Sequence, residues 1–142
     1  NVEDKNEKKI ICYIEAAAAY RKPPLTFSAE DMDPNLCTHI IYAFASMDPY
    51  QFTIVSNDEE FDIVQGGYKA VTGLKRFNPQ LKVLLAIGGT RQDAPHRFSS
   101  MISSASKRRD FIKSAYSIIR QYNFDGIEIH WEYPGKTYVI NI

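Results

Sequence analysis

The distribution of apolar and polar residues along the chain predicts alternating strands and helices. Short apolar runs bounded by turn residues are typical of buried strands, and apolar residues three or four positions apart are typical of helices that cover a sheet. The predicted strands are residues 9–14, 37–45, 82–87 and 126–132, and the predicted helices are residues 68–77 and 107–122. This order indicates βα units with parallel strands.

Two weaker local signals concern the connections between these elements. Ser28, with Asp31 three residues later, predicts a capped helical turn. Residues 52–55 and 61–64 are apolar runs on either side of a polar turn, and they predict a small hairpin. Both features are expected to lie outside the main sheet.

The overall composition is that of one globular domain. The chain has 142 residues, of which 44% are hydrophobic, and 17 basic residues balance 17 acidic ones. A neutral, evenly mixed charge offers no basic surface for nucleic acid and no polybasic anchor for a membrane. No apolar run approaches the roughly 20 residues of a membrane span, and the polar residues 1–9 do not resemble a signal peptide. We therefore expect no nucleic-acid or membrane partner.

Cys12 and Cys37 are the two cysteines of the chain. They can form one disulfide, which would stabilise the fold by roughly 3 kcal/mol in the chain-entropy model. The count alone is equally compatible with two buried free thiols in a cytosolic protein. Composition therefore leaves the redox state open.

The last predicted strand has an ionisable face and an apolar face, because side chains alternate along a strand. One face carries Glu128, His130 and Glu132, and the other carries Ile127, Ile129 and Trp131. An unpaired buried charge costs several kcal/mol, so three ionisable groups on a buried strand indicate a functional site. An exposed antiparallel strand with its polar face in water would show the same alternation. A divalent metal could also bind these side chains, but no second cluster completes a ligand set, and we expect no metal.

Residues 125–134 resemble the signature of glycoside hydrolase family 18, the chitinases and chitinase-like proteins. That signature reads Asp-Gly-x-Asp-x-Asp-Trp-Glu-Tyr-Pro, and eight of its ten positions match here when the two free ones are counted. The resemblance places Glu132 on the family's catalytic acid and Asp125 on its first aspartate. Glu128 and His130 replace the second and third aspartates.

The resemblance implies a hydrolase of chitin and other β-1,4-linked N-acetylglucosamine polymers that needs no cofactor. In such enzymes the sugar's 2-acetamido oxygen attacks the anomeric carbon while one carboxylic acid protonates the leaving oxygen. A neighbouring carboxylate keeps that acid protonated through like-charge repulsion. His130 cannot do this, so we expect hydrolysis to be weakened or lost. A non-catalytic carbohydrate-binding protein and an inactive truncated product are the alternatives.

The resemblance also implies an α/β fold, an incomplete (β/α)8 TIM barrel. It extends from about Lys9 to Gly135 and covers about the first four βα units, with mostly parallel strands. A complete barrel needs about 250 residues. We therefore interpret residues 1–142 as a single partial domain with a leader, 1–8, and an atypical tail, 136–142. Each outer strand would leave an unpaired edge, and self-association through these edges is a further hypothesis.

The candidate substrate-binding residues come from the strands and from the signature: Tyr13, Phe44, Gly88, Gly89, Trp131 and Tyr133. The resemblance places Phe44 on the floor of the sugar site, with Tyr13 close by, although plain core packing explains both equally well. Gly88 and Gly89 end a strand, which suits the close approach of a ligand or any tight loop.

Two further expectations follow from the resemblance. Tryptophans that stack on sugar rings in the family are replaced here, one by alanine in the run 16–19 and one by Thr90. Many secreted family members join the first strand to the start of the second by a disulfide. This favours a bridge between Cys12 and Cys37 and an extracellular location.

Overall fold

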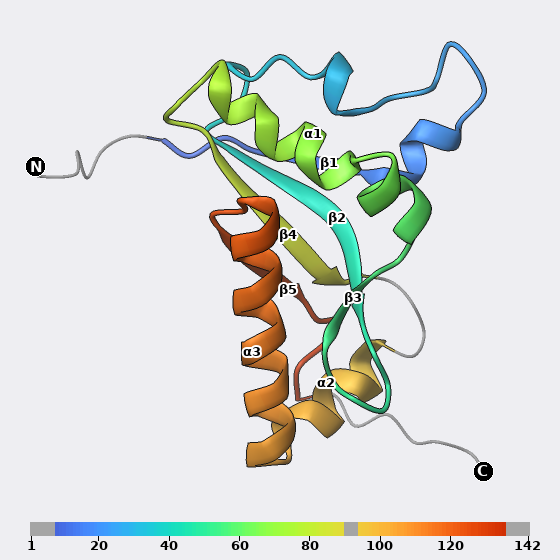
Figure 1. Ribbon diagram of the computed structural model, residues 1–142, viewed down its shortest axis with the longest axis vertical. Helices are drawn as coiled ribbons and strands as arrows, with labels where there is room; N and C mark the ends of the chain where they lie inside the picture. Colours follow the sequence, from blue (N-terminus) through green and yellow to red (C-terminus); the bar gives the residue numbers. More distant parts are fainter. Residues whose placement is uncertain (1–7, 90–93, 136–142) are drawn as a thin grey trace, which may run out of the picture.

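The computed structural model describes residues 8–89 and 94–135 (Figure 1). Residues 1–7 of the expected leader, the position Thr90 and the expected tail 136–142 lie outside the described residues. In the part of the chain that is described, no helix is long and apolar enough to cross a membrane.

One sheet of five strands organises the molecule. Its main path follows the order β1-β2-β4-β5, and every neighbouring pair on this path is parallel. The strands are β1 (Ile11–Glu15), β2 (His39–Met47), β4 (Lys82–Gly88) and β5 (Gly126–His130), with β3 (Ile54–Ser56) antiparallel to β2. The four predicted strands and their parallel arrangement are confirmed, and β3 adds a fifth. Among the described residues the sheet does not close into a barrel.

The helices lie together on one face of this sheet (Figure 1). They are α1 (Gly67–Gly73), α2 (Ala94–Ile102) and α3 (Ala105–Tyr122), with 3-10 turns at Ala16–Tyr20, Ala29–Asp31 and Leu74–Arg76. The helix predicted at 107–122 is confirmed as α3, which ends at the left-handed Asn123. The helix predicted at 68–77 begins as α1, but its last turn is a 3-10 helix and Phe77 is exposed. Ser28 caps its turn as predicted.

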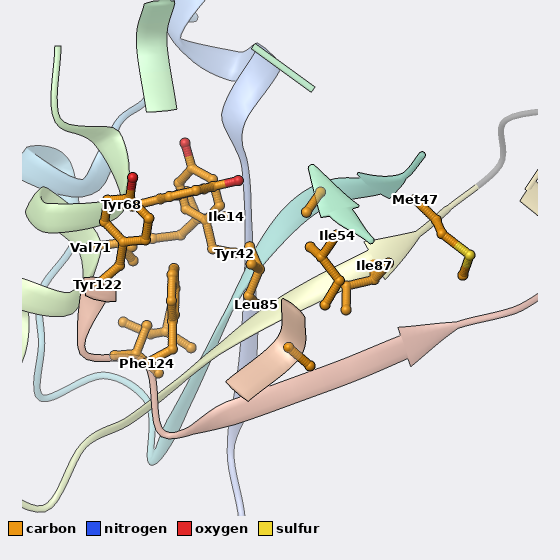
Figure 2. Packing of buried hydrophobic residues seen from close by; sticks show 14 of the residues in the cluster. Ile14, Tyr42, Met47, Ile54, Tyr68, Val71, Leu85, Ile87, Tyr122 and Phe124 are labelled. Carbon is orange, nitrogen blue, oxygen red and sulfur yellow. The ribbon is translucent and has the colours of Figure 1, made fainter. Parts of the chain in front are cut away.

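Aromatic rings form the centre of the core between the sheet and the helices (Figure 2). Tyr68 of α1 is fully buried in the middle of this cluster. Its ring lies edge-on to those of Tyr42, Tyr122 and Phe124, with centroid distances between 5.1 and 5.4 Å. Edge-on pairs add about 0.5–1.5 kcal/mol each beyond the area they bury. The cluster therefore fixes α1 and the end of α3 against β2 and the start of β5.

The hairpin predicted within residues 52–64 is wrong. β3 pairs with β2 instead, and Glu60–Val64 forms a π-helix. The physical reason is Asp62, which is almost fully buried and accepts hydrogen bonds from the hydroxyls of Tyr42 (2.6 Å) and Ser56 (2.5 Å). A buried carboxylate needs such partners. The π-helical turn places the Asp62 carboxylate beside these two hydroxyls.

β1 is less buried than the sequence predicts. Ile14 faces the helices and is buried, but Ile11 and Tyr13 face the other side and are each 53% exposed. The helices pack on the opposite face of the sheet, and β1 lies at its edge. Only half of this strand is therefore covered.

A disulfide joins Cys12 of β1 to Cys37, which lies just before β2, with Cα atoms 6.1 Å apart. The expected bridge is therefore present, and the alternative of two free thiols is wrong. The bridge fixes β1 to β2, its neighbour in the sheet.

Candidate functional site

The carboxyl end of β5 carries a histidine between two carboxylates. His130 is the last residue of β5, and Glu128 shares its face of the strand. Nδ1 of His130 lies 3.5 Å from Oε1 of Glu128, and Nε2 lies 3.2 Å from Oε1 of Glu132. The structure thus brings together the three ionisable side chains that the sequence grouped. We call Glu128, His130 and Glu132 the His130 cluster.

Glu128 is the more buried carboxylate of the cluster. Its side chain is 25% exposed, against 40% for Glu132. Oε2 of Glu128 is buried and has no hydrogen-bond partner among the described residues, and its register neighbour on β4 is the apolar Ala86. Burial raises the pKa of Glu128 above its ordinary value, and the adjacent His130 opposes that shift. Glu128 therefore holds a proton more readily than an exposed glutamate.

Phe44 and two glycines surround the histidine. The ring of Phe44, on β2, lies edge-on to that of His130 with centroids 5.1 Å apart. Gly88 and Gly89 have positive φ angles of 112° and 93°. A Cβ at Gly88 would overlap the carbonyl oxygen of His130, and one at Gly89 would lie 3.2 Å from the ring of Phe44. The glycines therefore let β2, β4 and β5 meet closely at the site.

Asp125 lies at the opposite end of β5. Its carboxylate accepts a hydrogen bond from the backbone N–H of Val83 (2.9 Å) and forms ion pairs with Lys75 (2.9 Å) and Lys82 (3.8 Å). These contacts tie the start of β5 to β4 and to the turn after α1. The structure does not bring Asp125 together with Glu132.

The remaining candidate substrate-binding residues are divided between the two faces of the sheet. The ring of Trp131 stacks on that of Phe98 in α2, with centroids 5.5 Å apart, on the helix-covered face. Tyr13 lies on the same face as the His130 cluster, where burial and the carboxylate of Glu128 raise its pKa. Tyr133 is exposed just beyond β5. Tyr13 therefore lies on the same face of the sheet as the His130 cluster, and Trp131 lies on the opposite face.

A hollow of about 330 Å³ opens in front of Phe44 and Gly88, at the carboxyl ends of β1, β2 and β4. Its lining includes three polar residues that the sequence did not single out: Tyr20, Asn57 and Asp58. The Tyr20 hydroxyl donates to Asp58 at 2.6 Å and holds the pKa of that carboxyl below its usual range. The side-chain amide of Asn57 donates to the Phe44 carbonyl at 2.7 Å. The polar turn at 56–59 was visible in the sequence, but only as a turn.

The chemistry of the cluster follows from the two ring nitrogens of His130. A neutral imidazole donates a hydrogen bond from one nitrogen, and an imidazolium donates from both. Because the two nitrogens contact different carboxylates, the three side chains do not converge on one point. No group of three or more His, Cys, Asp or Glu residues within 8–89 and 94–135 is arranged to hold a metal ion. The arrangement is an imidazole that hydrogen-bonds to one carboxylate, Glu132, and lies within ion-pair distance of another, Glu128.

Known proteins match nearly the whole chain. The family model described as glycosyl hydrolases family 18 matches residues 9–140. Probable chitinase 2 of Drosophila melanogaster is 43% identical over 135 residues, which are 92% of this chain and 28% of the relative. The chain therefore spans less than a third of that relative.

Solved structures with the same fold include a chitinase and a pseudo-chitinase. The Group IV chitinase of Ostrinia furnacalis superposes with a TM-score of 0.86 at 36% identity, covering 94% of this chain and 36% of that one. Human YKL-39, described as a pseudo-chitinase with retained chitooligosaccharide binding properties, superposes with a TM-score of 0.76 at 36% identity. That match covers 89% of this chain and 33% of YKL-39. The open sheet thus corresponds to part of a TIM barrel.

Proposed function

The chain belongs to family 18 of the glycosyl hydrolases, and on this premise we propose that it is a chitinase-like protein that binds chitin oligosaccharides, with hydrolysis weakened or lost. The ligand would be a β-1,4-linked N-acetylglucosamine oligomer. It would lie across the carboxyl ends of the strands, where barrels of parallel strands carry their functional residues. Phe44, Gly88 and the His130 cluster lie at these ends.

The observation that carries the proposal is the position of His130 beside Glu132. The family signature has an aspartate at position 130, which would repel the ionised form of Glu132 and keep its proton in place. The imidazole instead lies 3.2 Å from Oε1 of Glu132. An imidazole carries no negative charge in either of its protonation states. The neighbouring carboxylate that the family signature supplies beside the catalytic acid is therefore missing.

Binding does not depend on the proton of Glu132. The hollow in front of Phe44 combines an aromatic ring with hydroxyl, amide and carboxylate groups from Tyr20, Asn57 and Asp58. Convergent polar groups beside an apolar surface are typical of small-ligand sites, and they match the hydroxyl-rich edge and apolar face of a sugar ring. The description of YKL-39 as a pseudo-chitinase that still binds chitooligosaccharides supports the same division between binding and catalysis.

The other candidate residues take supporting roles in this proposal. Tyr13 and Gly89 would line the sugar site with Phe44, and Tyr133 would contact the sugar from beyond β5. Trp131 would fix the end of β5 against α2, through its stacking on Phe98 on the helix-covered face. Asp125 would position β5 from its far end through its backbone and lysine contacts.

We also propose that the protein is extracellular. The disulfide between Cys12 and Cys37 supports this location, because such bridges persist in oxidising compartments. Cell fractionation of the source organism with an antibody to the chain would test it, and a protein confined to the cytosol would contradict it.

Calorimetric titration with an N-acetylglucosamine tetramer tests binding. Phe44→Ala should weaken binding by about tenfold, since loss of one aromatic contact of about 1.4 kcal/mol corresponds to that factor. Phe77→Ala is the matched control, because Phe77 is exposed just after the 3-10 turn Leu74–Arg76, away from the carboxyl ends of the strands. It should bind like the parent.

Two results would contradict the binding proposal. One is a folded parent, with the circular dichroism of an α/β protein, that shows no heat of binding at millimolar tetramer. The other is equal weakening by Phe44→Ala and Phe77→Ala, which would show that the ligand does not contact the candidate site. The first result would leave an inactive product as the surviving alternative.

A further inference from the structure

A second hollow, of about 710 Å³, lies between the loop that joins β2 to β3 and the first part of α3. Sites for small ligands have volumes of roughly 300–1,000 Å³. The loop contributes residues 50–53, and α3 with its N-cap contributes four serines, two lysines and one aspartate. The described residues that line it are different from those that line the hollow in front of Phe44. We call this second hollow the Tyr50 groove.

The two walls of the Tyr50 groove are joined to each other. The backbone N–H of Ile54, in β3, donates a hydrogen bond to the Ser114 hydroxyl of α3 at 2.9 Å. Nζ of Lys107 lies 4.3 Å from the centre of the Phe52 ring, a distance typical of a cation–π contact. Neither contact involves β1 or β5. The shape of the groove therefore does not depend on what pairs with the outer strands of the sheet.

The loop is held in an unusual conformation that leaves one tyrosine exposed. The Asp48 carboxylate accepts hydrogen bonds from the backbone N–H groups of Tyr50 (2.8 Å) and Gln51 (2.7 Å). Phe52 has a φ of 57°, which is rare for a bulky residue. Such strain persists only where the surrounding structure holds it, and it is concentrated at functional sites. Here Phe52 is buried and Tyr50 is 88% exposed at the rim of the groove.

The charges in the groove favour a neutral ligand. Lys107 contacts the Phe52 ring and also donates a hydrogen bond to the Ser100 hydroxyl at 2.8 Å, so its ammonium is already engaged within the protein. Asp110 and Lys113 carry opposite charges and both line the groove. An anionic ligand would meet the aspartate, and a cationic ligand would meet the lysines. Neither sign of ligand charge is matched by the lining.

We propose that the Tyr50 groove is a second sugar-binding site, which takes a neutral, hydroxyl-rich oligosaccharide. The exposed ring of Tyr50 would pack against the apolar face of one sugar ring. The Gln51 amide and the hydroxyls of Thr53 and the serines would bond to its polar edge. That this sugar is an N-acetylglucosamine oligomer rests on the proposed function. The groove itself and its charge balance do not.

Residue-resolved amide NMR of the disulfide-intact chain, titrated with an N-acetylglucosamine tetramer, tests the proposal. Amide signals of residues 50–53 and 104–117 should shift with the sugar, in addition to signals around Phe44 and Gly88. In Phe44→Ala the groove signals should still shift with the same concentration dependence. The two sets of signals report the two sites separately, so failure of one is distinguishable from failure of the other.

Two variants disable the groove in different ways. Tyr50→Ala removes the exposed ring and should weaken binding at the groove by about tenfold. Ser106→Leu places a branched apolar side chain in the groove and should abolish the shifts of its signals. Tyr116→Ala is the matched control, because Tyr116 is also an exposed tyrosine, on α3, but does not line the groove. It should bind like the parent.

Several results would overturn the proposal. One is a set of groove signals that stays unchanged while those around Phe44 shift to saturation, which would leave the proposed function standing. Another is parent-like binding at the groove by both Tyr50→Ala and Ser106→Leu, or equal weakening by Tyr50→Ala and Tyr116→Ala. A groove that responds to a sulfated disaccharide and not to the tetramer would overturn the assignment of a neutral ligand. Shifts confined to the groove would support the second site and contradict the site at Phe44.

Discussion

Replacement of Gly88 by alanine should destabilise the protein more than the same change at Gly66. Both glycines have positive φ, 112° and 85°, where a residue with a Cβ is strained by roughly 1–2 kcal/mol. The two positions differ in the space around the added methyl group. Nothing lies within 4 Å of a Cβ at Gly66. A Cβ at Gly88 overlaps the carbonyl oxygen of His130 and lies 2.9 Å from the ring of Phe98.

The overlap sets the magnitude of the difference. The nearest atom belongs to the backbone, so β4 and β5 must move apart, and overpacking of this kind costs about 1–3 kcal/mol. The expected loss of unfolding free energy is therefore about 2–5 kcal/mol for Gly88→Ala and about 1–2 kcal/mol for Gly66→Ala. The first is a large share of the 5–15 kcal/mol that is typical of a domain.

Urea denaturation followed by far-ultraviolet circular dichroism measures both losses. The parent and the two variants should unfold with similar slopes, so the midpoints report the difference in stability. Equal midpoints for the two variants would refute the reasoning, because the φ strain would then account for the whole effect. A parent-like midpoint for Gly88→Ala would show that β4 and β5 do not meet as closely as described.

Three further changes test other parts of the molecule. The folded-state pKa of Glu128 is raised, so the stability it contributes is lost as the pH rises from the ordinary range of glutamate through that pKa. Glu128→Gln should therefore gain stability over the parent at about pH 7 and little at about pH 4, and a pH-independent difference would contradict this. Asp62→Ala leaves two hydroxyl donors without their acceptor and should cost about 2–4 kcal/mol of unfolding free energy in urea; a loss below about 1 kcal/mol would contradict the hydrogen bonds described. Reduction of the disulfide should lower the unfolding free energy by about 3 kcal/mol, whereas Cys12→Ser should not respond to reductant.

Local periodicity was sufficient to predict the elements that define the site. The two-residue alternation along 126–132 grouped Glu128, His130 and Glu132, and the structure places their side chains in contact. The apolar spacing within residues 107–122 is equally local, and the helix it predicts is confirmed as α3. In these cases the pattern and the three-dimensional neighbours coincide.

Features that depend on distant residues could not be predicted in this way. The π-helix around Asp62 follows from its hydrogen bond to Tyr42, which is 20 positions away, so the local apolar pattern favoured a strand. Burial of β1 was overestimated because it depends on how many neighbours the strand has in the sheet. An apolar run at an edge is indistinguishable from one at the centre.

The signature groups residues that lie apart in the fold. Asp125, Trp131 and Glu132 belong to one ten-residue motif. Asp125 nevertheless lies at the opposite end of β5, with its carboxylate held by lysines, and Trp131 lies on the helix-covered face. The length of β5 separates Asp125 from Glu132, and the alternation of side chains separates Trp131 from Glu132. The linear sequence of the motif does not show these separations.

Hydrolysis of a fluorogenic chitooligosaccharide tests the central claim, that His130 in place of the signature's aspartate weakens or abolishes hydrolysis. The parent is compared with Glu132→Gln and His130→Asp at equal concentration, with tetramer binding measured on the same samples. The account predicts that the parent binds the sugar but releases fluorophore no faster than Glu132→Gln. Turnover gained by His130→Asp would assign the loss to that one side chain. A parent rate that Glu132→Gln abolishes would contradict the account, because Glu132 would then donate its proton despite the imidazole beside it.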